Sequence, residues 1–322
     1  MMHERSGTYH YRLFGGVLSS DIVIPELDPI EPETPTWTLR SREGEPPGAD
    51  GTELGTDRVT GEVQARLYRR DTGLRLIFDD TGCFDIGEGG RSIEWVHAPE
   101  VSIDDARTDL TSRVLAAALH EAGTTCLHGS AVVIGDEAIG FVAPKFHGKS
   151  TLALALVRAG ARLLTDDTLP VMPGPQPRAC PGVHATRLWA DSAERVGIGG
   201  EGWESTGSKL LFRSLPDEYV SHSTHPLAAL YLLSPAREPS EGRMAWRTRL
   251  PTMEATLVMI GHAKLAPLLS GPEAPRLFRQ AAALAAVVPV YRLGIARDLD
   301  RIEEVAATIL SWHGSVPAGA LP

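Results

Sequence analysis

The sequence predicts an α/β protein with a smaller antiparallel β-rich N-terminal module, residues 1–102, followed by an α/β domain, residues 103–322. Short runs that alternate apolar and polar residues, separated by turn sequences, fill the first hundred positions, and such runs are typical of antiparallel strands. After residue 104 the apolar residues recur at helical spacing. A strand–loop–helix–strand order follows, which is typical of α/β folds.

Clear turn signals separate the strands expected in the N-terminal module. Residues 70–73, 79–82 and 87–90 each combine Gly with Asp or Glu, which favours tight turns between hairpin strands. Residues 31–56 are rich in Pro, Gly and acidic residues and are expected to form a surface loop. The expected strands are residues 9–14, 36–40, 62–69, 74–78, 83–86 and 93–97.

The α/β domain begins with a predicted helix at residues 105–121, which is amphipathic and is closed by Gly123. Residues 172–208 carry many Pro and Gly residues and are expected to be loop-rich, with a short helix at 191–196, where a mobile lid could lie. The other expected elements are strands 125–134, 138–142, 161–164, 227–233, 255–260 and 290–293, and helices 148–158, 274–287 and 299–310.

The composition is that of a folded, acidic protein. The chain has 322 residues, 43% of them hydrophobic, which suffices for one large or two unequal domains. It carries 31 Lys and Arg against 41 Asp and Glu, a net charge of -10. This charge disfavours non-specific binding to polynucleotides or anionic membranes, so neither nucleic acid nor membrane is expected as a partner.

The cysteines and apolar runs indicate a soluble, cytoplasmic protein. Cys83, Cys126 and Cys180 are far apart and include no Cys-x-x-Cys, so neither a disulfide framework nor a structural zinc site is expected. The first residues lack the apolar core of a signal peptide, and the most apolar late stretch, residues 281–290, is too short to span a bilayer.

A phosphate-binding loop is predicted between the strand at 138–142 and the helix at 148–158. The pattern G-x-x-x-x-G-K-[ST] wraps phosphates with backbone N–H groups, while Lys neutralises their charge and the hydroxyl reaches Mg²⁺. Ala143 replaces the opening Gly, and the half that carries the chemistry is intact. The alternative is a helix N-terminus capped by Ser150. The predicted nucleotide-binding residues are Ala143, Pro144, Lys145, Phe146, His147, Gly148, Lys149, Ser150 and Thr151.

Two acids follow the next strand. Asp166 and Asp167 come 17 residues after Lys149, so one helix returns the chain next to the loop. One carboxylate could hold Mg²⁺ while the other accepts a proton from an attacking hydroxyl; the alternative is a solvated strand end. Their mutual repulsion is expected to raise the pKa of one of them unless the metal is present. His128, before the loop strand, is either a satisfied core residue or a functional one.

The order and spacing of these segments resemble the C-terminal catalytic domain of HPr kinase/phosphorylase, a P-loop family related in its core to phosphoenolpyruvate carboxykinase. The resemblance rests on residues 127–130, 143–151 and 164–167. The wider chain resembles HPr-kinase-like proteins of bacterial peptide-modification clusters, some of which phosphorylate a serine of a lasso-type precursor peptide. Residues 11–21 and 288–299 carry that weaker resemblance.

The resemblance implies residue roles only where residues match. His128 matches the family's active-site His, Lys149 its phosphate-binding Lys, and Ser150 its hydroxyl on the Mg²⁺ side. Asp166 and Asp167 match its acidic pair, one of which is the general base; we expect Ser150 and Asp167 to hold the metal. The catalytic prediction is Asp166, Asp167, His128 and Lys149. The loop departs from the family's glycine-rich sequence, and HPr itself is not the expected substrate.

The function predicted from these features is an ATP- and Mg²⁺-dependent kinase for a hydroxyl, with a peptide or protein serine ahead of a small molecule. Arg187, Lys209 and Arg213, in or beside the expected lid, are candidates for the cation that transfer requires. The alternatives are a catalytically weak nucleotide-binding, peptide-presenting protein and a small-molecule phosphotransferase. The resemblance makes a homo-oligomer plausible, and the N-terminal module could recognise the acceptor or be structural.

Overall fold

The computed structural model describes residues 7–188, 193, 203–206, 209–212, 215–236 and 238–314. The chain divides into two compact units. Met1–Cys126 and Lys264–Arg279 form the first, while Leu127–Ala263 and Gln280–Pro322 form the second. None of the helices within the described residues is long and apolar enough to cross a bilayer.

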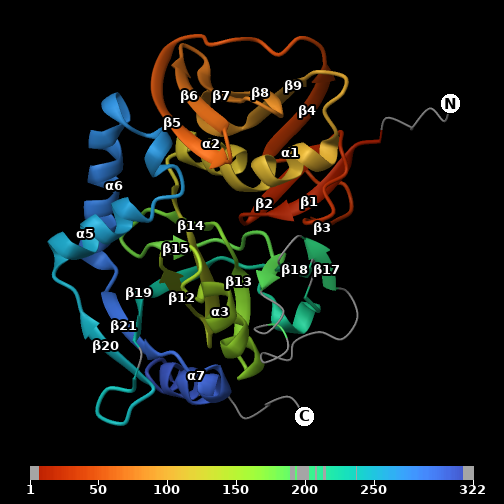
Figure 1. The fold of residues 1–322 in the computed structure, drawn as a ribbon. Helices are drawn as coiled ribbons and strands as arrows, with labels where there is room; N and C mark the ends of the chain where they lie inside the picture. Colours follow the sequence, from red (N-terminus) through yellow and green to blue (C-terminus); the bar gives the residue numbers. More distant parts are fainter. Residues whose placement is uncertain are drawn as a thin grey trace. The chain divides into compact units, whose positions relative to one another are not determined.

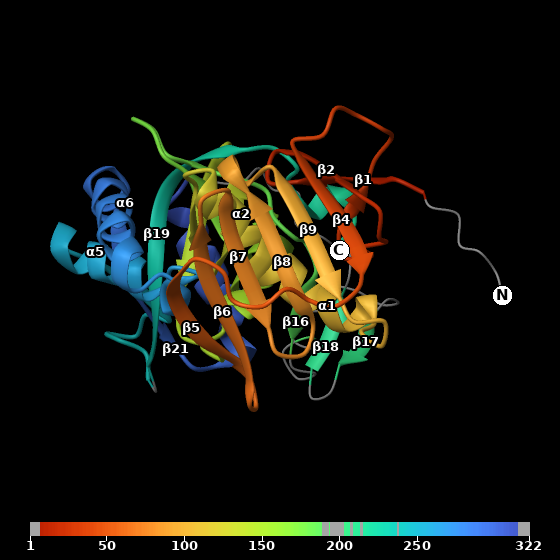
Figure 2. The same ribbon diagram turned by 90° about the horizontal axis from the view of Figure 1, so that it is seen from above.

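A mixed β-sheet forms the first unit, and Figure 2 shows its strands β4 and β6 to β9 side by side. The strand order is β3-β1-β2-β4-β9-β8-β7-β6-β5. The bounds are β1 (Tyr9–Leu13), β2 (Gly16–Ser20), β3 (Asp28–Pro29), β4 (Trp37–Glu43), β5 (Thr52–Thr60), β6 (Val63–Arg70), β7 (Gly73–Phe78), β8 (Gly82–Gly87) and β9 (Ser92–His97).

The sequence predicted an antiparallel sheet, but the sheet is only partly antiparallel. The hairpins from β5 to β9 are antiparallel, but β4 runs parallel to both of its neighbours, β2 and β9. Much of β5 also falls in the segment predicted as a surface loop. The sequence of β5 is largely polar because β5 is the last strand in the sheet order. The Ser270 N–H donates to the Leu54 carbonyl of this strand at 3.0 Å.

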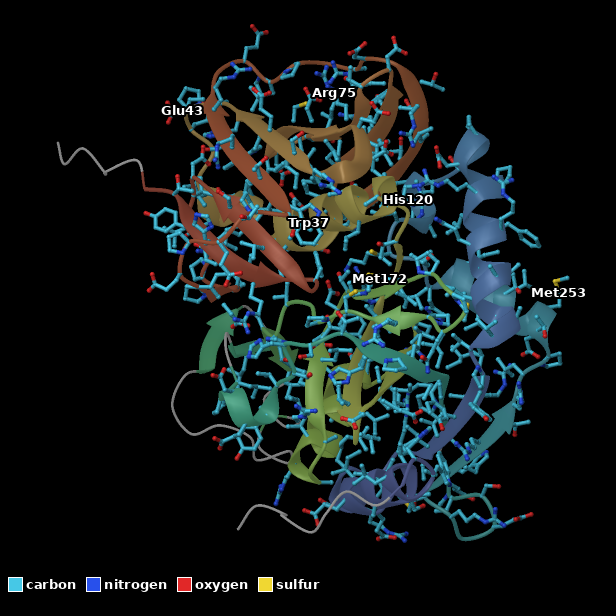
Figure 3. The ribbon with its side chains drawn as sticks, turned by 180° about the vertical axis from the view of Figure 1, so that it is seen from behind. Trp37, Glu43, Arg75, His120, Met172 and Met253 are labelled. Atoms are coloured by element: carbon cyan, nitrogen blue, oxygen red, sulfur yellow. The ribbon has the colours of Figure 1, made fainter. Side chains whose placement is uncertain are left out.

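The predicted helix after the sheet belongs to the first unit. It comprises α1 (Ile103–Asp109), a π-helical turn (Leu110–Val114) and α2 (Leu115–Glu121), and Gly123 ends it with a φ of 90°. The units therefore do not divide at residues 102 and 103. The helix packs closely against the sheet at Gly90, where a Cβ would lie 1.9 Å from the Ala118 carbonyl oxygen. Arg69 of the sheet also forms an ion pair with Glu121 of the helix at 2.7 Å. Figure 3 shows His120 on this helix.

The second unit is a sheet with helices on both faces. Its neighbouring strands are β14-β15-β19-β12-β11-β13, and β21 pairs with β19 and β20. On β11, Val132 belongs to the same apolar cluster as Leu156 of α3 and Ile309 of α7. Val133, which points to the other face, belongs to the cluster that contains Met259 of α5. Figure 1 shows α3 beside β12 and β13.

The bounds of the second unit's elements are β11 (Gly129–Ile134), β12 (Glu137–Val142), β13 (Arg162–Thr165), β14 (Leu169–Met172), β15 (Arg178–Ala179), β19 (His225–Ala236), β20 (Ala245–Arg249), β21 (Val290–Ala296), α3 (Lys149–Arg158), α5 (Thr252–Gly261) and α7 (Ile302–Ser311). A small sheet joins β16 (Thr186–Leu188), β17 (Trp203–Thr206) and β18 (Lys209–Phe212). The strand β10 (Thr125–Leu127) and the helix α6 (Ala274–Val287) each contribute residues to both units.

The sequence predicted α3, α6, α7 and the strands β11, β12, β13, β19 and β21, but it did not predict β14, β17, β18 or β20 and was wrong about one helix. Residues 255–260 were predicted as a strand and lie in α5. The run is apolar on every side of the helix, because buried Met259 is matched by Met253 and Leu257, which are 64% and 58% exposed; Figure 3 shows Met253 projecting outward. The segment expected to be loop-rich contains β15, β16 and β17. Apart from residue 193, the helix predicted at 191–196 lies outside the described residues.

Candidate phosphate-binding site

The predicted phosphate loop joins β12 to α3, where the sequence placed it. The end of β12 and Ala143 are fully buried, while Phe146 in the middle of the loop is 71% exposed. Phe146 and Gly148 have φ values of 67° and 85°, in the left-handed region that favours Gly. The loop therefore keeps a glycine-type backbone at residue 146 although a Phe occupies that position.

Lys149 is the first residue of α3 and is 8% exposed. Its Nζ donates hydrogen bonds to the carbonyl oxygens of Ala143 at 3.0 Å and Pro144 at 3.3 Å. The ammonium group therefore lies against its own loop, beside the N-terminal amides of a ten-residue helix. A positive side chain next to such amides favours binding of an anion.

Three strand ends meet at the loop. The strand β11 is antiparallel to β12, with Gly129 opposite Val142, and antiparallel to β13, with Ala131 opposite Thr165. Consequently β12 and β13 are parallel and end at the edge where β11 begins. The predicted strand–helix–strand unit is present, and β11 lies between its two strands.

Asp166 follows β13 and is 6% exposed. Its Oδ1 accepts hydrogen bonds from the Ser130 hydroxyl, from the Ser150 hydroxyl at 3.0 Å and from the Asp167 N–H at 3.0 Å. Burial raises the pKa of this carboxyl, the two serine hydroxyls oppose the rise, and the neighbouring Asp167 charge adds to it. A raised pKa was predicted from repulsion alone, whereas burial is the larger cause.

Asp167 turns away from the buried carboxyl. Its backbone φ of 70° is left-handed, and its side chain is 52% exposed. The Nδ1 of His128 lies 3.3 Å from Asp167 Oδ1 and 3.2 Å from the Asp167 carbonyl oxygen. The predicted metal pair was Ser150 and Asp167. The structure instead brings Ser150 to Asp166 and His128 to Asp167, because the positive φ directs the two successive acids to different partners.

Two further residues belong to this edge and were not predicted as site residues. Ser130 bonds Asp166, and only its place in the His-Gly-Ser sequence hinted at this role. The backbone carbonyl of His262 accepts the His128 N–H at 2.7 Å. Burial, followed by the charges of Lys149 and His128, lowers the pKa of His262 to about 4. The sequence did not indicate a site role for His262, because the helix that precedes it was predicted as a strand.

The remaining predicted residues contribute less to the site within the described part of the chain. Pro144 and Lys145 are exposed, and the His147 Nδ1 lies 3.0 Å from the Lys145 carbonyl oxygen within the loop. Thr151 is half-buried in the first turn of α3. The side chains of the three candidate lid cations, Arg187, Lys209 and Arg213, lie outside the described residues.

The comparisons with known proteins leave the family open. No protein-family model matches the sequence, and no curated protein matches it. Among solved structures, the HPr(Ser) kinase/phosphatase from Coxiella burnetii aligns at 14% identity and a TM-score of 0.30, covering 59% of this chain and 99% of that chain. A TM-score of 0.30 is too low to argue from, so the function is argued from the geometry of the site.

Proposed function

We propose that this chain is a nucleoside triphosphate-dependent kinase that transfers the γ-phosphoryl group to a hydroxyl, most suitably a serine of a peptide or protein. The observation that supports it is the hydrogen bond between Ser150 at the start of α3 and the buried Asp166. This bond joins the phosphate loop to the acids after β13. The same edge holds Lys149 for anions and the pair of Asp167 and His128 for proton transfer.

Lys149 and the N-terminal amides of α3 bind the β- and γ-phosphates in this proposal. The Lys149 Nζ is bonded to two carbonyl oxygens of the loop. Rotation of this one side chain exchanges those partners for phosphate oxygens without moving the backbone. A charge-assisted bond to phosphate is about twice as strong as a neutral hydrogen bond, which favours the exchange.

Ser150 and Asp166 fit a divalent metal. Both offer hard oxygen ligands, which Mg²⁺ prefers, and their oxygens lie 3.0 Å apart. Burial raises the pKa of Asp166, so a cation beside it would favour the ionised carboxylate. When bound, Mg²⁺ neutralises charge on the β- and γ-phosphate oxygens. We therefore place the metal with Ser150 and Asp166 rather than with Ser150 and Asp167.

Asp167 is the general base in this proposal. It is half-exposed, so an acceptor can reach it, and His128 lies 3.3 Å from its carboxylate and orients it. The proton of the acceptor hydroxyl passes to Asp167 while the hydroxyl oxygen forms a bond to the γ-phosphorus. The bond from that phosphorus to the β–γ bridging oxygen breaks, and the nucleoside diphosphate leaves with the electron pair.

A second candidate function is nucleotide binding with little transfer, as in a protein that presents a peptide to another enzyme. The observation that favours it is Phe146, whose bulky side chain is carried by a glycine-type backbone in the loop. A small-molecule phosphotransferase would use the same site with a different acceptor.

Transfer of label from γ-labelled ATP, with Mg²⁺ and the full chain, tests the proposal. Candidate serine peptides and small hydroxyl compounds are offered as acceptors, and labelled product is measured. Transfer to a serine peptide is the expected result. Binding of ATP without transfer to any acceptor would favour the presenting protein, while absence of both binding and transfer would overturn the proposal.

A further inference from the structure

The segment that follows α5 lies beside the active-site histidine. Leu127 and Ala263 form an antiparallel bridge, and the His128 N–H donates to the His262 carbonyl oxygen at 2.7 Å. Because the bridge is antiparallel, His262 lies directly opposite His128. The charge of His128 also acts on the His262 ring, so the two histidine side chains lie near each other.

His262 is also within electrostatic reach of the phosphate loop. The charge of Lys149, which belongs to α3, acts on it together with the charge of His128. Lys149 is the proposed phosphate ligand, and His128 orients the proposed base. The His262 imidazole is therefore close enough to both residues for their charges to act on it.

The ring of His262 is available for a ligand. Within the described residues neither of its ring nitrogens forms a hydrogen bond, and the residue is only half-buried. His262 closes the end of α5 through its backbone, because its N–H donates a hydrogen bond to the Val258 carbonyl at 3.0 Å. The fold therefore uses the backbone of His262 and leaves the imidazole unused.

We propose that the His262 imidazole donates a hydrogen bond to an oxygen of the γ-phosphoryl group, and so holds the group that is transferred. This inference rests on the proposed kinase function and adds a phosphate ligand to it. Donors aimed at the transferring group stabilise the charge that spreads over its oxygens in the transition state. The side chains of the cations expected from the lid lie outside the described residues, whereas His262 lies at the site edge.

The proposed donor is a neutral imidazole. Burial and the charges of Lys149 and His128 hold the pKa of His262 at about 4, well below neutral pH. A neutral ring still carries one N–H donor, and it adds no further positive charge beside Lys149. A side chain that keeps an N–H donor without a charge should therefore replace it in part.

The test compares the wild-type chain with His262→Ala and His262→Gln. Affinities for the β,γ-imido analogue of ATP and for ADP, both with Mg²⁺, are measured by titration calorimetry, and transfer is measured with the best acceptor. We expect His262→Ala to weaken binding of the triphosphate analogue about 10-fold while ADP affinity stays within about 2-fold. Transfer should fall on the order of 100-fold, and His262→Gln should recover part of both losses.

Leu257→Ala is the matched control, because Leu257 is on the exposed face of the same helix and should behave as wild type. Wild-type triphosphate affinity and transfer in His262→Ala would overturn the inference and leave the kinase proposal standing. An equal loss of ADP and triphosphate affinity, together with a lower melting temperature, would assign His262 a structural role and also overturn it. Failure of the wild-type chain to bind either nucleotide would overturn the kinase proposal itself.

Discussion

Glu273 of the first unit and Asp166 of the second are largely buried carboxylates with opposite surroundings. Glu273 of the first unit is bonded to a cation, with Arg69 Nη2 at 2.9 Å. Arg75, labelled in Figure 3, is likewise bonded to Asp85 at 2.7 Å. Asp166 of the second unit instead accepts its hydrogen bonds from two hydroxyls and one backbone N–H. Glu273 therefore has a cation beside it, whereas the donors to Asp166 are neutral.

The pKa values show the consequence of this difference. Burial acts to raise the pKa of Glu273, but the hydrogen bonds and charge of Arg69 hold it below its usual range. At Asp166 burial prevails and the pKa is raised. A buried acid whose ionised form the protein leaves unfavourable is typical of a site where a ligand supplies the missing charge. Burial also raises the pKa of Asp109 in the first unit, to about 6, so the feature that distinguishes Asp166 is its bond to Ser150 at the phosphate loop.

The largest effect is expected from Asp166→Asn. Asn has the same shape and accepts the same hydrogen bonds but cannot carry the charge that the metal needs, so transfer should fall by about 1,000-fold or more. Because the folded pKa of Asp166 is raised, its contribution to stability is present below the unfolded pKa and lost as the pH rises through the folded value. Unfolding at pH 7.5 without metal should therefore show Asp166→Asn at least as stable as wild type.

Loss of stability in Asp166→Asn at pH 7.5 would contradict this account, because it would mean that the ionised carboxylate supports the fold. The same measurement at pH 4 is the control. More of the wild-type carboxyl is protonated at the lower pH, so any difference in the free energy of unfolding between the two chains should shrink.

Asp167→Asn sharpens the division of work between the two acids. Asp167 is half-exposed and paired with His128, so its replacement should remove the general base, which contributes about 100-fold or more to transfer. Affinity for Mg²⁺ and the triphosphate analogue should stay within about 3-fold. A loss of Mg²⁺ affinity comparable to that of Asp166→Asn would show that Asp167 is a metal ligand, as the sequence predicted.

Arg69→Ala tests the structural half of the comparison. Removal of the guanidinium leaves Glu121 without this cation and Glu273 with Arg276 at 3.6 Å, and the free energy of unfolding at pH 7 should fall by about 2–3 kcal/mol. The folded pKa of Glu273 is lowered, so the contribution of the pair is lost as the pH falls through that value. The difference from wild type in denaturant unfolding should therefore be smaller at pH 4 than at pH 7.

Arg42→Ala is the control for Arg69→Ala, because Arg42 pairs with Glu94 where both side chains are more than half exposed. It should cost less than about 1 kcal/mol. A loss in Arg69→Ala that is no larger than the loss in Arg42→Ala would show that the buried pair does not stabilise the first unit.

The smallest effect is expected from Phe146→Gly. The φ of 67° at Phe146 strains a non-Gly residue by about 1 kcal/mol, but Gly also gains freedom in the unfolded chain. The net change in stability should be below about 1 kcal/mol, and triphosphate affinity should match or slightly exceed that of wild type. A 10-fold loss of affinity would instead show that the Phe146 side chain contacts the nucleotide.

The local parts of the site could be predicted from the sequence. The loop, Lys149 and the acid pair are each contiguous in the chain, and turn and helix-start chemistry define them locally. The partner of each acid could not be predicted, because the left-handed backbone at Asp167 decides it. His262 could not be predicted either, since it reaches the site only through pairing of Leu127 with Ala263.

The fold shows the same limit. The hairpins of the first unit were predicted from turn signals, whereas the parallel pairing of β4 with β2 and β9 depends on contacts between distant segments. The strand wrongly predicted at 255–260 is an apolar run whose period is obscured, because Met253 and Leu257 are exposed on the same helix. Periodicity cannot distinguish a helix that is apolar on all sides from a buried strand.

The most direct test of the central claim is titration of ATP, with Mg²⁺, into the wild-type chain and into Lys149→Ala. The account predicts saturable binding by the wild-type chain that weakens when the metal is chelated and falls by about 100-fold or more in Lys149→Ala. Equal affinity in the two chains, or no binding by the wild-type chain, would contradict the phosphate site at the start of α3.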